Sequence, residues 1–244
     1  MIIKADFHLH SCLSPCGDLS MSPNAIAAIL AEKGVRLAAL TDHNTALNCP
    51  AFGYACRVHD IIPLYGIEAQ PQEECHILCL FGGLDSALEL GQKLYELMPP
   101  VMNNPEKMGD QIYVNEDEEI LGEVDKYLIT SAEIGLEDLS SLVLRLGGIV
   151  IPAHVDRPAF SLTSQLGFIP DGPWSALEVV RMPTAAGIDT RAYPLITSSD
   201  AHYPEHIGRR PFDLDIGGSP LTGAGGSANM ETIKAALARR PRQS

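Results

Sequence analysis

A chain of 244 residues, 45% of them hydrophobic, can bury a large core in one barrel or in two small domains. Its formal net charge of −14, without a run of lysines and arginines, argues against a groove that binds long nucleic acids. No apolar stretch reaches the roughly 18 residues that span a membrane, and no basic segment precedes an apolar one at the start. We therefore expect a cytoplasmic protein.

The first part of the chain alternates strand and helix patterns. Ile2 to His8 is predicted to form a strand, followed by a helix from Ser22 to Lys33 and a second strand from Val35 to Leu40. Ser22 suits the N-cap of that helix, and Pro23 suits its first position. The next predicted elements are a helix, two strands and a helix: Ala46 to His59, Ile61 to Ile67, Cys75 to Phe81 and Ser86 to Met98. This alternation indicates a parallel sheet or a (β/α) barrel.

A β-hairpin insertion is predicted within residues 101–130. Its strands, Gln111 to Val114 and Ile120 to Leu121, flank an acidic segment that is typical of a solvated turn. Glu137 to Leu146 then returns to a helix that ends at a glycine pair. The remaining predicted elements are four strands, a glycine-rich loop and a final helix: Ile149 to Ile151, Ala176 to Val180, Leu195 to Thr197, Asp213 to Ile216, Gly217 to Ser227 and Met230 to Arg239. The whole chain is expected to form one domain.

Histidines and carboxylates gather in five segments of the chain. Four segments end in histidine or histidine–carboxylate clusters: Asp6-Phe7-His8-Leu9-His10, Thr41-Asp42-His43-Asn44, Pro152-Ala153-His154 and Ser199-Asp200-Ala201-His202. The fifth is Gly66-Ile67-Glu68, with His76 shortly after it. Imidazoles and carboxylates are ligands that divalent ions select, so this clustering at the ends of apolar runs predicts a polynuclear metal site.

The spacing within these segments gives the site a geometry. His8 and His10 are two residues apart at a strand end, so both imidazoles point to one side, about 6.6 Å apart along the chain. Asp200 and His202 repeat that spacing, and His43 and His154 each follow an apolar strand. In parallel α/β and barrel folds the carboxyl ends of the strands line one mouth. We expect all these side chains to converge there.

Cysteines offer a second, weaker metal pattern. Cys12 and Cys16 share a spacing with Cys75 and Cys79, which leaves a zinc or iron–sulfur site open. The second pair lies in an apolar strand-like run, which favours reduced thiols that act as small buried hydrophobic residues. We therefore predict reduced, buried cysteines rather than a cysteine metal site.

The combination of the five histidine–carboxylate segments resembles the PHP family, named for its polymerase and histidinol phosphatase members. The resemblance covers residues 6 to about 208 and implies a distorted (β/α)7 barrel, phosphoesterase activity and two or three divalent Mn, Fe or Zn ions. It implies that Glu68 bridges two ions. The further ligands implied for the first, second and third ions are, in turn, His8, His10 and Asp200; His76 and His154; and Asp18, His43 and His202. Asp18 lies further from the His8-Leu9-His10 motif than the equivalent ligand usually does.

A metal-activated hydroxide is the expected nucleophile, because divalent ions lower the pKa of bound water and stabilise the charge of a phosphate. Asp42, next to His43, is predicted either to orient a ligand or to cap the following turn. Arginine matches phosphate oxygens with its planar guanidinium. The candidates for phosphate contacts near the strand or motif ends are Arg157, Arg181, His206 and Arg209.

These observations predict a metal-dependent phosphoesterase that hydrolyses a small phosphorylated metabolite or nucleotide. One alternative is a 3′–5′ exonuclease or polymerase-associated PHP module, and a second is a non-catalytic metal-binding regulatory domain. The densest basic spots are only Arg209-Arg210 and residues 239–242, which counts against the first alternative. The presence of every expected ligand type counts against the second.

Overall fold

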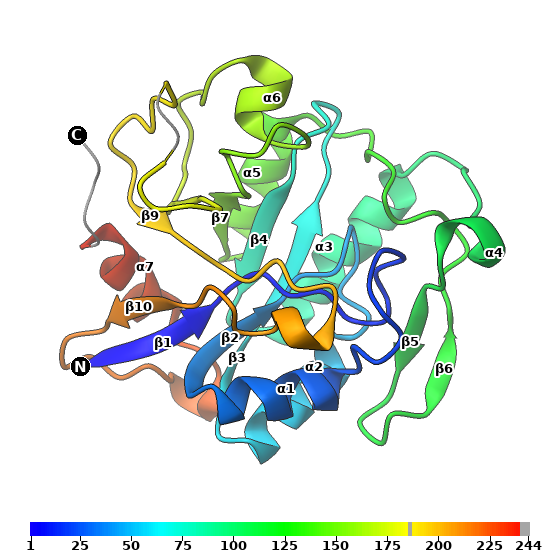
Figure 1. The fold of residues 1–244 in the computed structure, drawn as a ribbon, viewed down its shortest axis with the longest axis horizontal. Helices are drawn as coiled ribbons and strands as arrows, with labels where there is room; N and C mark the ends of the chain where they lie inside the picture. The colour runs from blue at the N-terminus through cyan, green and yellow to red at the C-terminus, as the bar shows by residue number, and fades with distance from the viewer. Residues whose placement is uncertain (185–186, 240–244) are drawn as a thin grey trace.

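The computed structural model describes residues 1–184 and 187–239, so residues 240–242 of the basic tail lie outside the described residues. Six strands form one curled, mixed sheet in the order β10-β1-β2-β3-β4-β7 (Figure 1). Their bounds are β1 Ile2–Asp6, β2 Val35–Leu40, β3 Ile62–Ala69, β4 Ile77–Phe81, β7 Ile149–Pro152 and β10 Phe212–Asp215. A separate parallel pair consists of β8 Leu177–Glu178 and β9 Leu195–Ile196.

The sheet is mixed, whereas the sequence pattern favoured parallel strands. Strands β1, β2 and β3 are parallel because a helix crosses over between each consecutive pair. Strand β4 runs antiparallel to β3, since only residues 70–76 connect them and a connection this short holds no crossover helix. Strands β7 and β10 are antiparallel to β4 and β1 respectively. The start of β4 therefore lies at the same end of the sheet as the carboxyl ends of β1 to β3.

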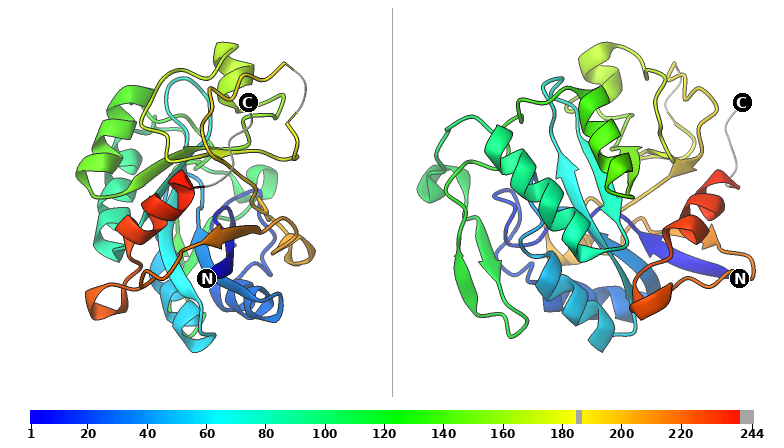
Figure 2. Two further views of the ribbon diagram at one scale, coloured as in Figure 1. Left: turned by 90° about the vertical axis from the view of Figure 1, so that its left-hand side faces the viewer. Right: turned by 180° about the vertical axis from the view of Figure 1, so that it is seen from behind.

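Most of the long helices cover one face of the sheet, and the last one packs on the opposite face. The α-helices are α1 Pro23–Glu32, α2 Cys49–Val58, α3 Leu84–Leu97, α4 Pro105–Met108, α5 Leu136–Arg145, α6 Leu162–Leu166 and α7 Met230–Ala238. As predicted, α1 begins after Ser22, whose hydroxyl accepts a hydrogen bond from Ala25 N. Helix α3 packs on β3 and β4, and α5 packs on β7. Seen from behind, α3 and α5 lie across the sheet (Figure 2).

Two apolar clusters follow from the alternation of side chains along each strand. In β2, Leu37 and Ala39 belong to the inner cluster of the curled sheet, whereas Ala38 and Leu40 pack in the cluster under the helices. Single bridges between Val150 and Trp174 and between Leu9 and Ala201 extend the curl beyond the six strands. The architecture is therefore a mixed α/β fold whose sheet forms a curled half-barrel.

The predicted hairpin is confirmed. It consists of β5 Ile112–Val114 and β6 Ile120–Glu123, and lies apart from the main sheet at the right of Figure 1. Ile112 N donates to Cys12 O at 3.3 Å, and Val114 N donates to Asn48 Oδ1 at 2.9 Å. The hairpin thus packs against the loop that follows β1 and against the start of α2.

Most other predicted elements are confirmed with small shifts of their ends. The short helices α4 and α6 were not predicted, and β8 and β9 are shorter than expected because few backbone hydrogen bonds join them. The predicted loop 217–227 contains a single 3-10 turn, η2 Ala224–Gly226, and a second turn, η1 Pro204–His206, precedes β10. Within the described residues, no helix is both long and apolar enough to cross a bilayer.

Candidate metal centre

One end of the curled sheet brings the predicted ligands together. His8 and His10 follow β1, His43 follows β2, and His154 follows β7. His76 instead precedes β4, and it reaches the same place because β4 runs in the opposite direction. The reversed direction of β4 thus explains why His76 lies before its strand rather than after it.

The carboxylate of Glu68, near the end of β3, is the centre of the cluster and only 1% exposed. Its oxygens contact five imidazoles: His8 Nε2 at 3.1 Å, His10 Nε2 at 3.3 Å, His43 Nδ1 at 3.1 Å, His76 Nδ1 at 2.8 Å and His154 Nε2 at 3.1 Å. A single buried carboxylate shared by five imidazoles is suited to bridging cations.

Asp200 adds a second carboxylate beside the first pair of histidines. Its Oδ1 lies 3.5 Å from His8 Nε2, and 3.6 Å from both His10 Nε2 and His202 Nδ1. Its other oxygen, Oδ2, accepts a hydrogen bond from Arg157 Nη1 at 2.9 Å. Asp200 therefore joins the buried cluster to an arginine that is 37% exposed.

Carboxylates and hydroxyls behind the cluster fix which nitrogen of each histidine faces it. His8 Nδ1 donates to Glu178 Oε2 at 2.9 Å, and this carboxylate also accepts from His154 N at 2.8 Å. His10 Nδ1 donates to the Ser14 hydroxyl at 3.0 Å, and Ser14 donates to Asp42 at 2.7 Å. Both histidines are thereby held with Nε2 directed at the centre, as metal-ligating histidines usually are.

The tautomers of two further histidines are fixed in the same way. His202 Nδ1 lies 3.2 Å from the carbonyl oxygen of Asp200, to which it donates, leaving Nε2 free to bind an ion. His76 Nε2 donates to Gln70 Oε1 at 3.2 Å, and the Gln70 amide in turn donates to Ser131 Oγ, which fixes its orientation. His76 therefore presents Nδ1 to Glu68.

Several buried ring nitrogens of the cluster lack hydrogen-bond partners among the described residues, which indicates the kind of ligand that the cluster can bind. The Nδ1 atoms of His43, His76 and His154 are buried and have no hydrogen-bond partner among the described residues, although the first two lie close to Glu68. A buried polar atom without a partner is costly, and a cation beside Glu68 would satisfy the lone pairs of His43 and His76, whose Nδ1 atoms face that carboxylate. Three groups have ligand atoms within 4.8 Å of one another: His8, His10 and Asp200; His43, Glu68 and His76; and His10, Cys16, His43 and His202. The donor set fits divalent ions.

The electrostatics of the cluster divide its members into two kinds. Burial alone would raise the pKa of Glu68, but the surrounding charges of His76, His8 and His43 outweigh it and hold that pKa well below its usual value. Burial lowers the pKa of His10, but hydrogen bonds to Asp200 and Glu68 prevail and raise it to about 9. Burial, with the charge of His10, lowers the pKa of His202 to about 3. The carboxylates thus favour the protonated form of His10, whereas burial favours the neutral form of His202, in which a ring nitrogen can bind a cation.

Two of the predicted ligands have strained backbone conformations. His154 has φ 30° and Asp200 has φ 46°, values that residues with a side chain rarely adopt. Such strain persists where the surroundings over-determine the conformation, typically at functional sites. At both positions the turn directs the side chain back to the cluster as the chain leaves its strand.

The structure corrects the expectation for Asp18. Its carboxylate is exposed and accepts hydrogen bonds from Ser20 N at 2.8 Å and from Ser20 Oγ at 2.5 Å, so it does not join the histidines. Cys16, which is half-buried, lies beside His10, His43 and His202 instead. The other five cysteines are buried free thiols, as predicted. Burial raises the pKa of the Cys16 thiol.

The predicted phosphate-binding residues are placed differently from one another. Arg157 contacts Asp200 and, with Arg181, lines a cavity of about 440 Å³ beside the cluster. The guanidinium of Arg209 donates to the carbonyl oxygens of Ser199 and Asp200, so it supports the loop that carries a ligand. His206 lies in η1, where its ring packs edge-on against Tyr203.

Sequence reasoning missed three residues of the site. Glu178 is a charged residue inside the apolar run of β8, and that mismatch is the signal that marks it. Cys16 carried only a spacing pattern. Phe160, whose ring stacks on that of His76 at 5.0 Å and is 38% exposed, carried no signal at all.

Comparisons with known proteins agree with this picture. A family model described as the PHP domain matches residues 6–155. The lesion-specific endonuclease Q from Pyrococcus furiosus superposes with a TM-score of 0.64 at 18% identity, over 100% of this chain and 57% of that chain. Endonuclease Q bound to a 27-mer duplex with an abasic lesion gives 0.65 at 20% identity, over 100% and 58%.

A candidate metal-dependent phosphoesterase from Bifidobacterium adolescentis gives a TM-score of 0.57 at 16% identity, over 97% of this chain and 96% of that chain. No curated protein matches the chain significantly. The chain spans a little over half the length of the endonucleases, and at these identities the likeness concerns the fold.

Proposed function

The chain belongs to the PHP family, and from that premise we propose that it is a metal-dependent phosphoesterase acting on a small phosphorylated metabolite or nucleotide. The observation that carries the proposal is the shared carboxylate of Glu68 among five imidazoles. Two or three Mn, Fe or Zn ions at this centre are part of the proposal. So is a distorted (β/α)7 barrel, in which β8 and β9 continue the curl of the sheet.

The chain's own residues have distinct tasks in this reaction. When bound, the ions would lower the pKa of a water molecule and polarise a phosphoryl oxygen. Glu68 and Asp200 hold negative charge at the centre, so cations are favoured there. Glu178 keeps the Nε2 atom of His8 directed inward, and the pair Ser14 and Asp42 does the same for His10. Asp42 is therefore a positioning residue in this account.

Arg157 is the residue through which substrate would be recognised. Its guanidinium is bonded to Asp200 on one side and faces the cavity shared with Arg181 on the other. That cavity, about 440 Å³, falls in the size range of small-molecule sites. Asp156 shapes it by accepting hydrogen bonds from Val180 N and Arg181 N. Two cationic side chains beside a metal centre suit a small phosphate ester.

A phosphatase panel on protein reconstituted with Mn²⁺, Zn²⁺ or Fe²⁺ tests this function. We expect release of phosphate from nucleoside monophosphates or sugar phosphates, and loss of that release after chelation. The matched control is Glu68→Gln, prepared and loaded in the same way. Metal-loaded protein that releases no phosphate from any member of the panel would contradict the proposal.

A nuclease acting on DNA is the second candidate, and the fold likeness to endonuclease Q favours it. Phe160 offers an exposed ring at the edge of the centre on which a base can stack. The net charge of −14 opposes a long backbone contact. Including single-stranded oligonucleotides and a duplex with an abasic site in the panel separates the two. Faster, strongly salt-sensitive cleavage of these substrates would reverse our ranking.

A further inference from the structure

The loop that follows β1 holds Cys16 in a fixed position. Successive turns join Ser14 N to Ser11 O at 3.1 Å and Gly17 N to Ser14 O at 2.8 Å. A Cβ at Gly17 would lie 2.7 Å from Ser11 O, so only glycine lets the loop close this tightly. Asp18 N then donates to His202 O at 2.8 Å, which ties the end of the loop to the centre.

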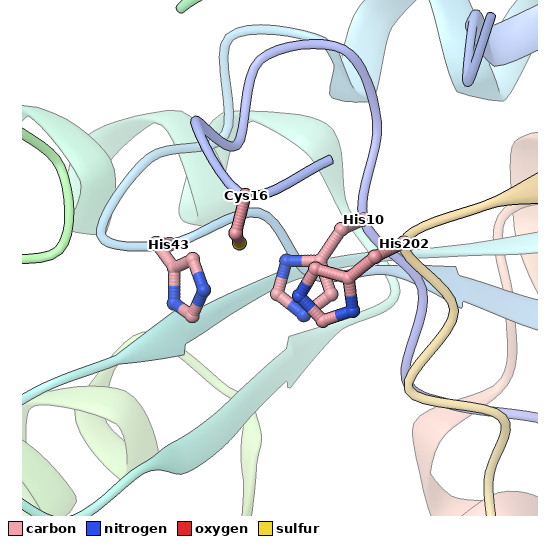
Figure 3. A group of neighbouring side chains, drawn as sticks. All are labelled: His10, Cys16, His43 and His202. Carbon is pink, nitrogen blue, oxygen red and sulfur yellow. The ribbon is translucent and has the colours of Figure 1, made fainter. Parts of the chain in front are cut away.

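These turns direct Cys16 inward and Asp18 outward. The Sγ atom of Cys16 and one nitrogen each of His10, His43 and His202 lie within 4.8 Å of one another. Figure 3 shows the sulfur pointing into the space between His43 on one side and His10 and His202 on the other. The ligand atoms of a four-coordinate zinc ion lie about 3.5 Å apart. The ligand atoms of this group would therefore have to approach one another by about 1 Å to bind zinc.

A second observation points to a ligand at the same place. His43 is 4% exposed, and within the described residues its Nδ1 atom makes no hydrogen bond, although it lies 3.1 Å from Glu68 Oε2. His202 uses Nδ1 on a backbone carbonyl, which leaves Nε2 available. His10 is also close, but its Nδ1 is bonded to Ser14 and its Nε2 contacts two carboxylates, those of Glu68 and Asp200. Cys16, His43 and His202 are therefore the members of this group with fewer competing carboxylate contacts than His10.

We propose that Cys16 binds an ion as a thiolate together with His43 and His202, in the place where a carboxylate was expected. The inference rests on the metal centre proposed above and specifies one of its sites. Binding breaks the S–H bond and releases one proton to solvent as the sulfur–metal bond forms. A thiolate is a soft ligand, so it favours zinc over manganese or magnesium at this position.

Cys12, four residues earlier in the same loop, is a natural control. Its side chain is buried and turns the other way, with Sγ 3.8 Å from Ile112 O and 3.7 Å from Asn48 Nδ2. It shares the loop, the residue type and the redox environment of Cys16, but not the histidines. A change that tracks Cys16 and not Cys12 therefore reports the site rather than the loop.

Cobalt substitution tests the proposal spectroscopically. Protein loaded with Co²⁺ should show a sulfur-to-cobalt charge-transfer band in the near ultraviolet, retained in Cys12→Ser and lost in Cys16→Ser. Elemental analysis of the same samples should show one ion fewer in Cys16→Ser. A fully loaded parent protein without the band, or an unchanged band in Cys16→Ser, would overturn the inference. If ions bind but the band is missing, only the proposal of a thiolate ligand is contradicted. If none binds, the metal centre itself fails.

Thiol labelling of the unsubstituted protein guards against a variant that does not fold. Zn²⁺ should slow alkylation of Cys16, identified by peptide mass, without changing the rate at Cys12. Equal rates at Cys16 with and without the ion would count against the proposal. Cys16→Asp adds a test of selectivity, because a carboxylate should shift metal preference from Zn²⁺ toward Mn²⁺ in direct competition. An unchanged ratio would also count against a thiolate ligand.

Discussion

Two regions of the centre hold their side chains by different means. His8, His10 and Glu68 stand at the ends of β1 and β3, where backbone pairing fixes their spacing and direction. Cys16 and Asp18 stand in the loop after β1, where a series of turns decides which of them faces inward. The strand ends place a ligand by periodicity, whereas the loop selects one by local hydrogen bonds. The direction in which a side chain points can therefore be inferred from sequence at the strand ends, but not in the loop.

The largest effect should come from the strand-end region, at Glu68. Glu68→Gln keeps the shape of the side chain but removes the charge that five imidazoles share. We expect most bound metal to be lost and kcat to fall by about three orders of magnitude or more. Elemental analysis and kinetics measure both. Glu89→Gln, on the exposed surface of α3, is the control. Full metal content in Glu68→Gln would mean that the Glu68 carboxylate does not bind the ions.

A smaller effect is expected from the groups that orient the strand-end ligands. Glu178→Gln weakens the acceptor of His8 Nδ1, and Ser14→Ala removes the acceptor of His10 Nδ1. Each change should lower metal affinity by about 10–100-fold, the usual range for such supporting contacts. Competition with a chelator measures the affinity. Unchanged affinity in both variants would mean that the strands alone orient these histidines.

The next effect concerns the rim of the strand-end region. Arg157→Ala removes a cation from the cavity, and we expect KM for a phosphate ester to rise about tenfold or more with a smaller change in kcat. Arg181→Ala is the matched variant, because Arg181 is exposed and lines the same cavity, whereas the guanidinium that is bonded to Asp200 is that of Arg157. Phosphate inhibition should weaken in parallel with KM. Equal KM values in the parent protein and Arg157→Ala would mean that Arg157 only pairs with Asp200 and does not bind substrate.

The smallest effect is expected in the loop, at Asp18. Its exposed carboxylate bonds only within the turn to Ser20, so Asp18→Ala should leave metal content unchanged. The free energy of unfolding should change by less than about 1 kcal/mol, as is usual for a surface substitution. Metal analysis and chemical denaturation measure these quantities. Loss of an ion in Asp18→Ala, with none lost in Cys16→Ser, would exchange the roles assigned to the two residues.

The strand-end region could largely be predicted from sequence. The apolar runs before His8, His43 and His154 mark strands, and ligands at their ends follow from the geometry of such folds. The N-cap at Ser22 and the hairpin were also predictable, because both depend on residues close in sequence. Even His76 was predicted to face the centre, although the reversed direction of β4 that brings it there was not.

The remaining features depend on contacts distant in sequence or on the exact course of a loop. Glu178 orients His8, which lies 170 residues away in the sequence, and the residues around Glu178 do not indicate this partner. The orientation of Cys16 depends on the tight turn at Gly17 and on a hydrogen bond to His202. The placement of Phe160 over His76 follows a positive φ that no residue pattern indicates.

The central claim is that a polynuclear metal centre surrounds Glu68. A crystal structure of the zinc-loaded protein, with anomalous data collected at the zinc edge, tests it most directly. We expect at least two anomalous peaks bonded to the Glu68 carboxylate and its imidazoles, and a further peak bonded to Cys16 Sγ. Fully loaded crystals with no anomalous peak within bonding distance of Glu68 would contradict the account.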